Sequence, residues 1–207
     1  MATKSELTQQ LGVVAGFDSP RADLEQYRTP PELAAHLVHT ADLQGDVEDH
    51  TVVDLGCGTG MLALAAALRG PAQVVGLDID PGPLSIAREN ERRVASASAV
   101  AWVRGDATRA PLCPDGSTTV LMNPPFGAQA GNEHADRAFL DTTARIADVS
   151  YSIHNAESVD FVEAFAADNG GEITHAYTAE FDLPHSFEFH DEETRTIGVE
   201  VFRIDWQ

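Results

Sequence analysis

The residues with the clearest chemical meaning are Asn123-Pro124-Pro125-Phe126, which follow the apolar stretch Val120-Leu121-Met122. The side-chain oxygen of Asn123 and the backbone carbonyl of Pro124 offer two acceptors for the hydrogens of an amino group, and would draw its lone pair towards an incoming methyl group. The adjacent prolines keep this backbone extended and stiff. Phe126 adds a flat apolar face on which a base can stack. A purely structural strand end before a turn would show the same residues. The rest of the chain must therefore distinguish a site for an amine from a structural turn.

A strand, a glycine loop and a helix in the first half of the chain indicate a nucleotide-cofactor site. The strand is Thr51-Val52-Val53-Asp54-Leu55, the loop is Gly56-Cys57-Gly58-Thr59-Gly60, and an Ala/Leu-rich helix begins at Met61. Glycines allow a ligand to approach the backbone closely. A dinucleotide site has G-x-G-x-x-G, whereas here the third glycine comes one residue early, and Asp54 would repel a pyrophosphate. The loop favours a cofactor with an amino group and a sulfonium; a structural turn is the alternative.

Two further acids follow predicted strands. Asp78 ends the strand 73–77 and is placed to accept hydrogen bonds from both ribose hydroxyls. Asp80 is expected to cap the following helix. Asp106 follows the strand 99–103, where it can accept from the exocyclic amine of adenine while the backbone of Ala107 meets the ring edge. For Asp106, an ordinary loop position is the alternative.

The segment before the glycine loop contains Gln26, Tyr27 and Thr29. Thr29 before Pro30 predicts a helix cap with proline in the first turn. A functional interpretation makes all three residues a lip over the cofactor. Both interpretations stay open from the sequence.

The remaining pattern predicts alternating helices and strands. We expect a short N-terminal helix or arm with Leu7, Leu11, Val13 and Val14 on one side, and a helix after Pro81. Further helices are expected over 135–147 and 158–167, and strands over 149–153, 173–181 and 196–204. The polar segment 127–136 is a candidate lid, and the aromatic segment 183–190 either touches substrate or simply connects two strands.

Composition limits the possible environments. The chain has 207 residues, which suits one domain, and a formal net charge of −20 with Lys4 as its sole lysine. Such acidity is typical of proteins from organisms with a very salty cytoplasm, where a Debye length of roughly 3 Å at molar salt would weaken repulsion of RNA. The longest apolar run, 55–68, is shorter than the roughly 20 residues that a bilayer requires, and no signal segment precedes it. We therefore expect a cytoplasmic protein without membrane attachment.

Cysteine and histidine spacing favours no metal site. Cys57 and Cys113 lack C-x-x-C partners, and the eight histidines lack ligand spacing on a helix. His154, after a predicted strand, is expected to be a positioned polar residue.

Together these segments resemble class I S-adenosylmethionine-dependent methyltransferases, and more narrowly the methyltransferase-like protein 5 family of ribosomal RNA N6-adenosine methyltransferases. The resemblance covers nearly the whole chain. It rests on Leu24-Glu25-Gln26-Tyr27, Asp54-Leu55-Gly56-Cys57-Gly58, Asp78-Ile79-Asp80, Asn123-Pro124-Pro125-Phe126-Gly127, Tyr151-Ser152-Ile153-His154, and Leu183-Pro184 with Phe189-His190.

The resemblance implies an α/β, Rossmann-like fold with a seven-stranded, mostly parallel sheet, an antiparallel last strand and helices on both faces. Residues 1–50 would form a helical arm and cofactor lip in the same domain as the methyltransferase core 51–207. A small zinc-ribbon activator would add to a strand edge as a heterodimer partner. With the residue pattern, the resemblance gives these S-adenosylmethionine contacts: Gln26, Tyr27, Thr29, Asp54, Gly56, Gly58, Thr59, Met61, Asp78, Ile79, Asp106, Ala107 and Asn123.

The leading hypothesis is methyl transfer to the N6 of an adenosine in small-subunit ribosomal RNA, with catalytic roles for Asn123, Pro124, Pro125 and Phe126. Methylation of adenine in duplex DNA is an alternative, disfavoured because we find no separate target-recognition domain. Protein-glutamine N5 methylation poses the same chemical problem, although that family's motif usually has Tyr where this chain has Phe126. A non-catalytic cofactor-binding scaffold is the least favoured, and a nicotinamide-dependent oxidoreductase is disfavoured by the glycine spacing.

Overall fold

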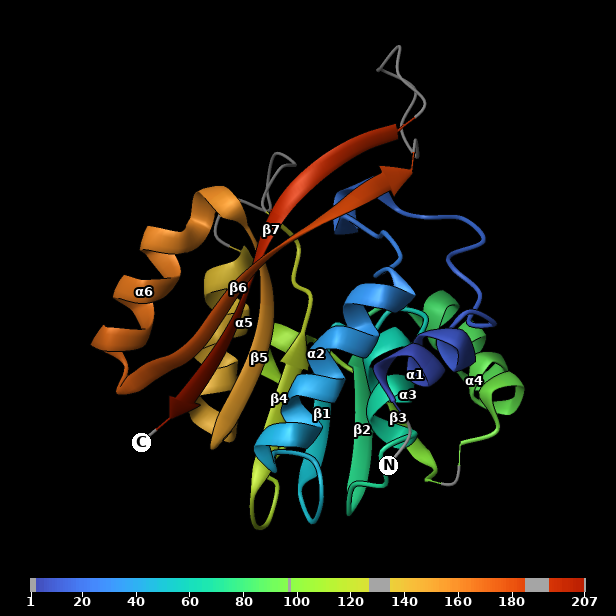
Figure 1. Ribbon diagram of the computed structural model, residues 1–207, viewed down its shortest axis with the longest axis horizontal. Helices are drawn as coiled ribbons and strands as arrows, with labels where there is room; N and C mark the ends of the chain where they lie inside the picture. Colours follow the sequence, from blue (N-terminus) through green and yellow to red (C-terminus); the bar gives the residue numbers. More distant parts are fainter. Residues whose placement is uncertain (1–2, 97, 127–134, 185–193, 207) are drawn as a thin grey trace.

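A single seven-stranded sheet organises the molecule. The computed structural model describes residues 3–96, 98–126, 135–184 and 194–206. Its strand order is β3-β2-β1-β4-β5-β7-β6. β1 to β5 run parallel, whereas β7 runs antiparallel to both of its neighbours (Figure 1). The predicted mostly parallel sheet with an antiparallel last strand is confirmed.

The strands are β1 (Thr51–Leu55), β2 (Gln73–Asp78), β3 (Val100–Arg104), β4 (Thr118–Met122), β5 (Val149–Asn155), β6 (Gly171–Pro184) and β7 (Thr194–Trp206). The α-helices are α1 (Lys4–Leu11), α2 (Pro31–Gln44), α3 (Met61–Ala67), α4 (Pro81–Val94), α5 (Ala135–Ile146) and α6 (Val159–Asp168). The short 3₁₀ helices are η1 (Ala22–Leu24), η2 (Ala107–Arg109) and η3 (Ala156–Ser158). No helix in these described ranges is long and apolar enough to cross a lipid bilayer.

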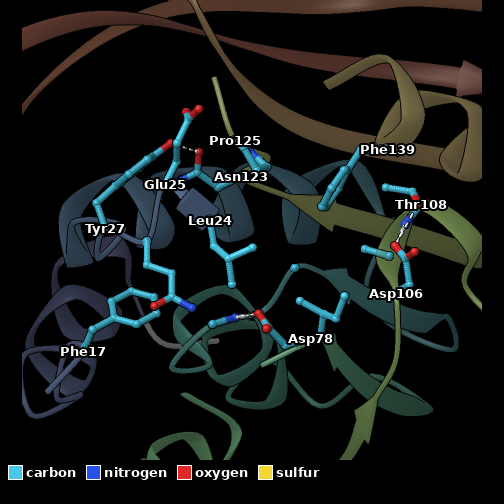
Figure 2. A pocket seen from close by; sticks show the side chains of 15 residues that line it. Phe17, Leu24, Glu25, Tyr27, Asp78, Asp106, Thr108, Asn123, Pro125 and Phe139 are labelled. Carbon is cyan, nitrogen blue, oxygen red and sulfur yellow. Dashed lines mark hydrogen bonds between the residues drawn. The ribbon is translucent and has the colours of Figure 1, made fainter. Parts of the chain in front are cut away.

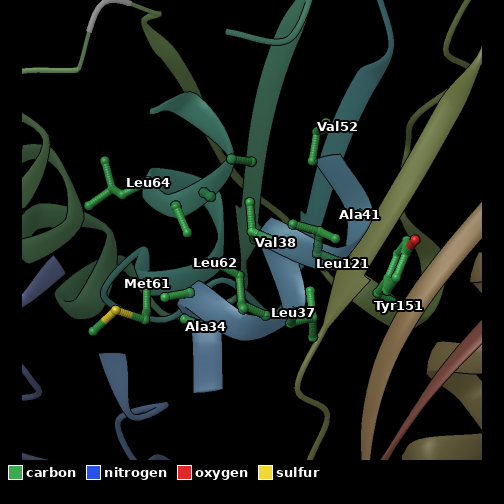
Figure 3. Close-up of a cluster of buried hydrophobic side chains, with 14 of the residues drawn as sticks. Ala34, Leu37, Val38, Ala41, Val52, Met61, Leu62, Leu64, Leu121 and Tyr151 are labelled. Atoms are coloured by element: carbon green, nitrogen blue, oxygen red, sulfur yellow. The ribbon is translucent and has the colours of Figure 1, made fainter. Parts of the chain in front are cut away.

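Hydrophobic clusters cover both faces of the sheet, because alternate residues of a buried strand point to opposite sides. On one face, α1, α2 and α3 pack around residues such as Leu37, Leu62 and Leu121 (Figure 3). On the other face, Leu140 of α5 and Phe165 of α6 pack against residues such as Val120. The N-terminal arm therefore shares a core with the sheet through α1 and α2.

Strand register explains why distant residues meet at one edge. Leu55 of β1 is paired with Leu77 of β2 and Met122 of β4. The residues that follow these positions, Gly56, Asp78 and Asn123, therefore leave the sheet at the same carboxyl edge. In open α/β sheets this edge is where ligands bind.

Several local expectations need correction. Thr29 does not cap α2: Pro30 holds the cap position, Pro31 begins the helix, and no side chain caps it, because the Thr29 hydroxyl bonds elsewhere. Val13 is 53% exposed and does not share the buried stripe of Leu7 and Leu11.

The last two strands and the two segments expected to lie near the substrate differ from the expected ranges or lie partly outside the described residues. β6 and β7 are longer than expected, since their antiparallel ladder runs from Gly171↔Trp206 to Pro184↔Thr194. Of the candidate lid, 127–134 lie outside the described residues, and 135–136 begin α5. Of the aromatic segment, 183–184 belong to β6 and 185–190 lie outside the described residues.

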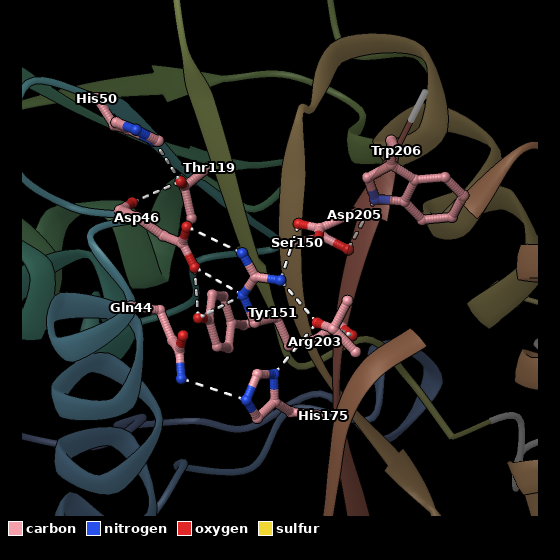
Figure 4. A network of polar contacts seen from close by, with 11 residues as sticks. Gln44, Asp46, His50, Thr119, Ser150, Tyr151, His175, Arg203, Asp205 and Trp206 are labelled. Atoms are coloured by element: carbon pink, nitrogen blue, oxygen red, sulfur yellow. Dashed lines mark hydrogen bonds and ion pairs between the residues drawn. The ribbon is translucent and has the colours of Figure 1, made fainter. Parts of the chain in front are cut away.

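A buried ion pair joins the segment before β1 to the antiparallel end of the sheet (Figure 4). Arg203 of β7 donates from Nε to Asp46 Oδ2 at 2.8 Å and from Nη2 to Asp46 Oδ1 at 3.1 Å. The Tyr151 hydroxyl of β5 donates to the same carboxylate at 2.6 Å. Both charged side chains are largely buried. Arg203 also pairs with the more exposed Asp205 at 2.8 Å, whereas Asp46 depends on Arg203 for compensation.

We expect Asp46→Ala to lower the free energy of unfolding by about 1.5–3 kcal/mol, because it removes one of the two carboxylates that bind the largely buried Arg203 guanidinium and leaves Asp205. Urea denaturation would measure the loss. Glu48→Ala, at an exposed position nearby, is the control and should change stability little. Equal stability of the two variants would show that the ion pair does not hold this end of the sheet.

Candidate active site

Two adjoining cavities lie at the carboxyl edge of the sheet. The large cavity has a volume of about 220 Å³ and the small cavity about 40 Å³. They share five lining residues: Phe17, Tyr27, Gly56, Gly58 and Asn123. Figure 2 shows Asp78, Asp106, Asn123 and Phe139 around the large cavity. A ligand that spans both cavities must pass Asn123.

Most of the residues expected at the site line one cavity or both. The large cavity gathers Gln26, Tyr27, Gly56, Gly58, Asp78, Ile79, Asp106, Ala107, Asn123 and Pro125. The small cavity gathers Tyr27, Thr29, Asp54, Gly56, Gly58, Thr59, Met61 and Asn123. Pro124 and Phe126 are not among the described lining residues of either cavity. Phe126 instead packs against Tyr27, with ring centroids 5.3 Å apart.

The Asn123 amide is held by two hydroxyl groups from the arm before α2. Its Nδ2 donates to Thr29 Oγ1 at 3.0 Å, and its Oδ1 accepts from the Tyr27 hydroxyl at 3.1 Å. Burial raises the pKa of Tyr27 well above its ordinary value, which keeps this hydroxyl protonated and able to donate. A carbonyl oxygen has two lone pairs, so Oδ1 can accept a second hydrogen bond, from an amino group.

The glycine loop is shaped by aromatic contacts and by backbone conformation. Gly56 and Gly58 have φ values of +71° and +51°. A β-carbon at Gly56 would lie 3.0 Å from the Phe139 ring, and one at Gly58 would lie 2.9 Å from the Phe17 ring. Both conformation and space therefore require glycine at these two positions.

Two buried acids make the site electronegative. Asp54 Oδ2 accepts from the backbone N–H of Ala63 at 2.8 Å, and Asp78 accepts from the N–H groups of Gly58 and Asp80 at 2.7 and 2.8 Å. Burial raises the pKa of Asp54 to about 7, and the neighbouring Asp78 adds to the shift. Burial also raises the pKa of Asp78, against the hydrogen bonds to its carboxylate. Such a site favours a cationic ligand over a pyrophosphate.

Asp80 and Asp106 also hold local backbone. Asp80 accepts from Gly82 N–H at 2.9 Å and caps α4, as predicted. Asp106 Oδ1 accepts from the Thr108 backbone at 2.9 Å and from its hydroxyl at 2.7 Å. Asp106 therefore caps η2 as well as lining the large cavity.

The arm is fixed to α4 on both sides of η1. Asn90, fully buried, accepts from Ala15 N–H at 2.9 Å and donates to the Ala15 and Thr59 carbonyls, each at 3.0 Å. Gln26 Nε2 donates to Asp80 Oδ2 at 3.0 Å. Tyr27 and Thr29 are thereby held within reach of the end of β4.

Sequence reasoning missed several lining residues: Phe17, Leu24, Glu25, Arg28, Cys57, Leu62, Thr108 and Phe139. Leu24 and Glu25 belong to the motif Leu24-Glu25-Gln26-Tyr27, in which Gln26 and Tyr27 were the expected cofactor contacts. Phe17 and Arg28 stand in a segment without periodicity, where an isolated aromatic or cationic residue was the available signal. Phe139 lies within a predicted helix, where an apolar residue is expected to pack in the core.

Comparison with known proteins gives consistent similarities. A family model described as a methyltransferase domain matches residues 52–147. The chain is 37% identical to an uncharacterized protein of Methanocaldococcus jannaschii, MJ0284, over 99% of this chain and 95% of that protein. It is 33% identical to the rRNA N(6)-adenosine-methyltransferase METTL5 of Danio rerio, over 96% of this chain and 97% of that protein. The crystal structure of PH1948 from Pyrococcus horikoshii superposes with a TM-score of 0.89 at 36% identity, covering 100% of this chain and 98% of that one.

We expect Asp54→Asn to flatten the pH dependence of stability. Because the folded-state pKa of Asp54 is raised to about 7, the folded state binds more protons than the unfolded state between about pH 4 and pH 7. This carboxyl therefore makes stability fall as pH rises through that window, and asparagine keeps the acceptor for Ala63 without the charge. Thermal unfolding of the ligand-free protein from pH 4 to pH 8 measures the effect.

Asp115→Asn, which removes an exposed carboxyl, is the matched control. If the Asp54 and Asp115 variants show the same pH dependence as the parent, the Asp54 carboxyl is not perturbed as the structure indicates.

Proposed function

Because the chain belongs to the METTL5 family of rRNA N(6)-adenosine-methyltransferases, we propose that it transfers a methyl group from S-adenosylmethionine to the N6 of an adenosine in small-subunit ribosomal RNA. The observation that carries this proposal is the position of Asn123, which lines both cavities while its amide is fixed by Thr29 and Tyr27. An oriented amide oxygen beside a cofactor cavity suits a substrate amine.

The charges that line the cavities suit S-adenosylmethionine. In the large cavity, Asp78 would hold the ribose hydroxyls, while Ile79, Asp106 and Ala107 would contact the adenine. Ile79 is 50% exposed, which leaves its side chain available to a flat ring. The small cavity, between Asp54 and the glycine loop, would take the methionine end. When bound, the cofactor supplies an electrophilic methyl group on a sulfonium.

The catalytic contribution of the chain is the positioning of an amine. Asn123 Oδ1 and the Pro124 carbonyl would accept from the two N6 hydrogens, which orients the nitrogen lone pair away from the adenine ring. The bond from Asn123 Nδ2 to the Thr29 hydroxyl holds the plane of the amide. Such orientation supplies effective concentration equivalent to roughly 7–11 kcal/mol at most. No general base is needed, because the proton can leave to water after transfer.

The base would have to enter beside Tyr27 and Phe126. Their rings already pack together, and both belong to the partly buried residues that contact the core. An unpaired adenine could stack on this pair, as single-stranded RNA bases do on aromatic side chains. A structured or single-stranded RNA site is therefore the favoured substrate.

A zinc-ribbon activator is the proposed partner, and it would add to a strand edge. Within the described ranges, β3 and β6 are the two edges of the sheet, and both have exposed residues. Co-expression with such a protein should raise the thermal stability of the chain. An unchanged thermal stability would contradict the proposed heterodimer. The cytoplasmic location stays a prediction.

Methylation of purified small ribosomal subunits tests the proposed reaction. With labelled S-adenosylmethionine, we expect label in N6-methyladenosine after digestion of the RNA to nucleosides. Label in ribosomal protein alone would support glutamine methylation instead.

We expect Asn123→Ala to lower the methylation rate by at least about 10²-fold, because one oriented acceptor is lost, while cofactor affinity changes little. Single-turnover kinetics and calorimetry with S-adenosylhomocysteine measure the two effects. Asn155→Ala, at the end of the neighbouring strand β5, is the matched control. Turnover equal to that of the parent would contradict the role of Asn123.

We expect Phe126→Ala to weaken RNA binding by roughly 1–3 kcal/mol through lost stacking. Fluorescence anisotropy with a labelled RNA fragment measures the change. Phe161→Ala, which removes an aromatic ring from α6, is the control. Unchanged affinity and rate in the Phe126 variant would reject a stacking role.

A further inference from the structure

Arg28 lines the small cavity and has no counter-ion among the described residues. It is the one Lys or Arg among the described residues that line either cavity. Its Nε is buried from solvent and has no hydrogen-bond partner. None of the ion pairs between described residues involves it. A buried N–H without an acceptor is costly, and an anion bound in the cavity would satisfy it.

The arm holds the Arg28 side chain beside the glycine loop. A β-carbon at Gly16 would lie 3.4 Å from the Arg28 Cδ, so the arginine stem passes close to the Gly16 backbone. The preceding residue, Ala15, is bound through Asn90 to the Thr59 carbonyl. Arg28 therefore lies close to a segment that is bonded to the glycine loop, and residues 56–59 of this loop line the small cavity. The stem of Arg28 is therefore held beside the small cavity.

The other charges in the small cavity define the ligand chemistry. Asp54, 1% exposed, lines the same cavity, and no carboxylate of a described residue pairs with Arg28. A ligand that satisfies both residues carries a cation for Asp54 and an anion for Arg28 on one small group. An α-amino acid has this arrangement, and the methionine end of S-adenosylmethionine is an α-amino acid.

We propose that Arg28 binds the carboxylate of the methionine moiety of S-adenosylmethionine, an inference that rests on the proposed function. The RNA phosphates are the other anions in the proposed reaction. They lie on the outside of a nucleic acid, whereas the Arg28 Nε is buried. Asp54 and Arg28 would then bind the two opposite charges of the same amino acid group. The adenosine end would extend past Asn123 into the large cavity.

The test compares two ligands that differ in the amino acid group. S-adenosylhomocysteine has the α-carboxylate, and 5′-methylthioadenosine lacks the whole amino acid end. Arg28→Met removes the guanidinium and keeps an unbranched stem beside Gly16. We expect calorimetry to show that this variant binds S-adenosylhomocysteine about 10- to 100-fold more weakly than the parent, and binds 5′-methylthioadenosine as the parent does.

Two further variants complete the design. Arg28→Lys keeps the positive charge and should recover part of the affinity for S-adenosylhomocysteine. Arg92→Ala removes an exposed charge from α4 and should leave both affinities unchanged. Thermal unfolding without ligand confirms that each variant is folded.

Equal weakening of both ligands by Arg28→Met, or no weakening of either, would overturn the assignment of Arg28 and leave the proposed function standing. A parent protein that binds neither ligand would overturn the proposed function and this inference with it. Parent affinity for 5′-methylthioadenosine without affinity for S-adenosylhomocysteine would overturn the inference alone.

Discussion

The hydrogen bonds that fix the Asn123 amide are the constraint on which the site depends. An amide that turned over would present its NH₂ group to an amine, and donor would face donor. Thr29 accepts from Nδ2 and Tyr27 donates to Oδ1, which holds the plane of the amide and leaves one lone pair of the oxygen for the amine. Both hydroxyls come from the arm, whereas Asn123 follows β4. The distance between arm and strand must therefore be constant, and the bonds from Ala15 to Asn90 and from Gln26 to Asp80 maintain it.

The two buried acids of the site act on a bound ligand at short range, whereas the net charge of the whole chain acts at long range. Asp54 and Asp78 lie at the ends of adjacent parallel strands, where burial raises both pKa values. A cation bound there would lower these pKa values again, so the site gains free energy from a sulfonium or ammonium group. The overall charge of −20 acts at longer range and is screened by salt. An acidic surface and an RNA substrate are compatible where recognition depends on contact rather than on long-range attraction.

Local patterns in the sequence predicted the strands and the strand-end acids, whereas the seven-stranded sheet with its antiparallel last strand was implied by the family resemblance. Parallel strands end at a common edge, so the spacing of Asp54, Asp78 and Asn123 was sufficient to bring them together. For Thr29 the sequence left a helix cap and a cofactor lip both open, because a hydrogen bond to a residue far away in sequence cannot be read from its neighbours. For the same reason Phe17 and Arg28 were missed: the approach of the arm to the glycine loop depends on tertiary contacts.

The central claim is tested most directly by the structure of a complex with S-adenosylhomocysteine and an RNA fragment that contains the target adenosine in its unmethylated form. The account predicts that the N6 amine lies within hydrogen-bonding distance of Asn123 Oδ1, while the bond from Nδ2 to Thr29 is kept. An adenine held elsewhere, or an Asn123 amide turned with its NH₂ group towards the amine, would contradict it.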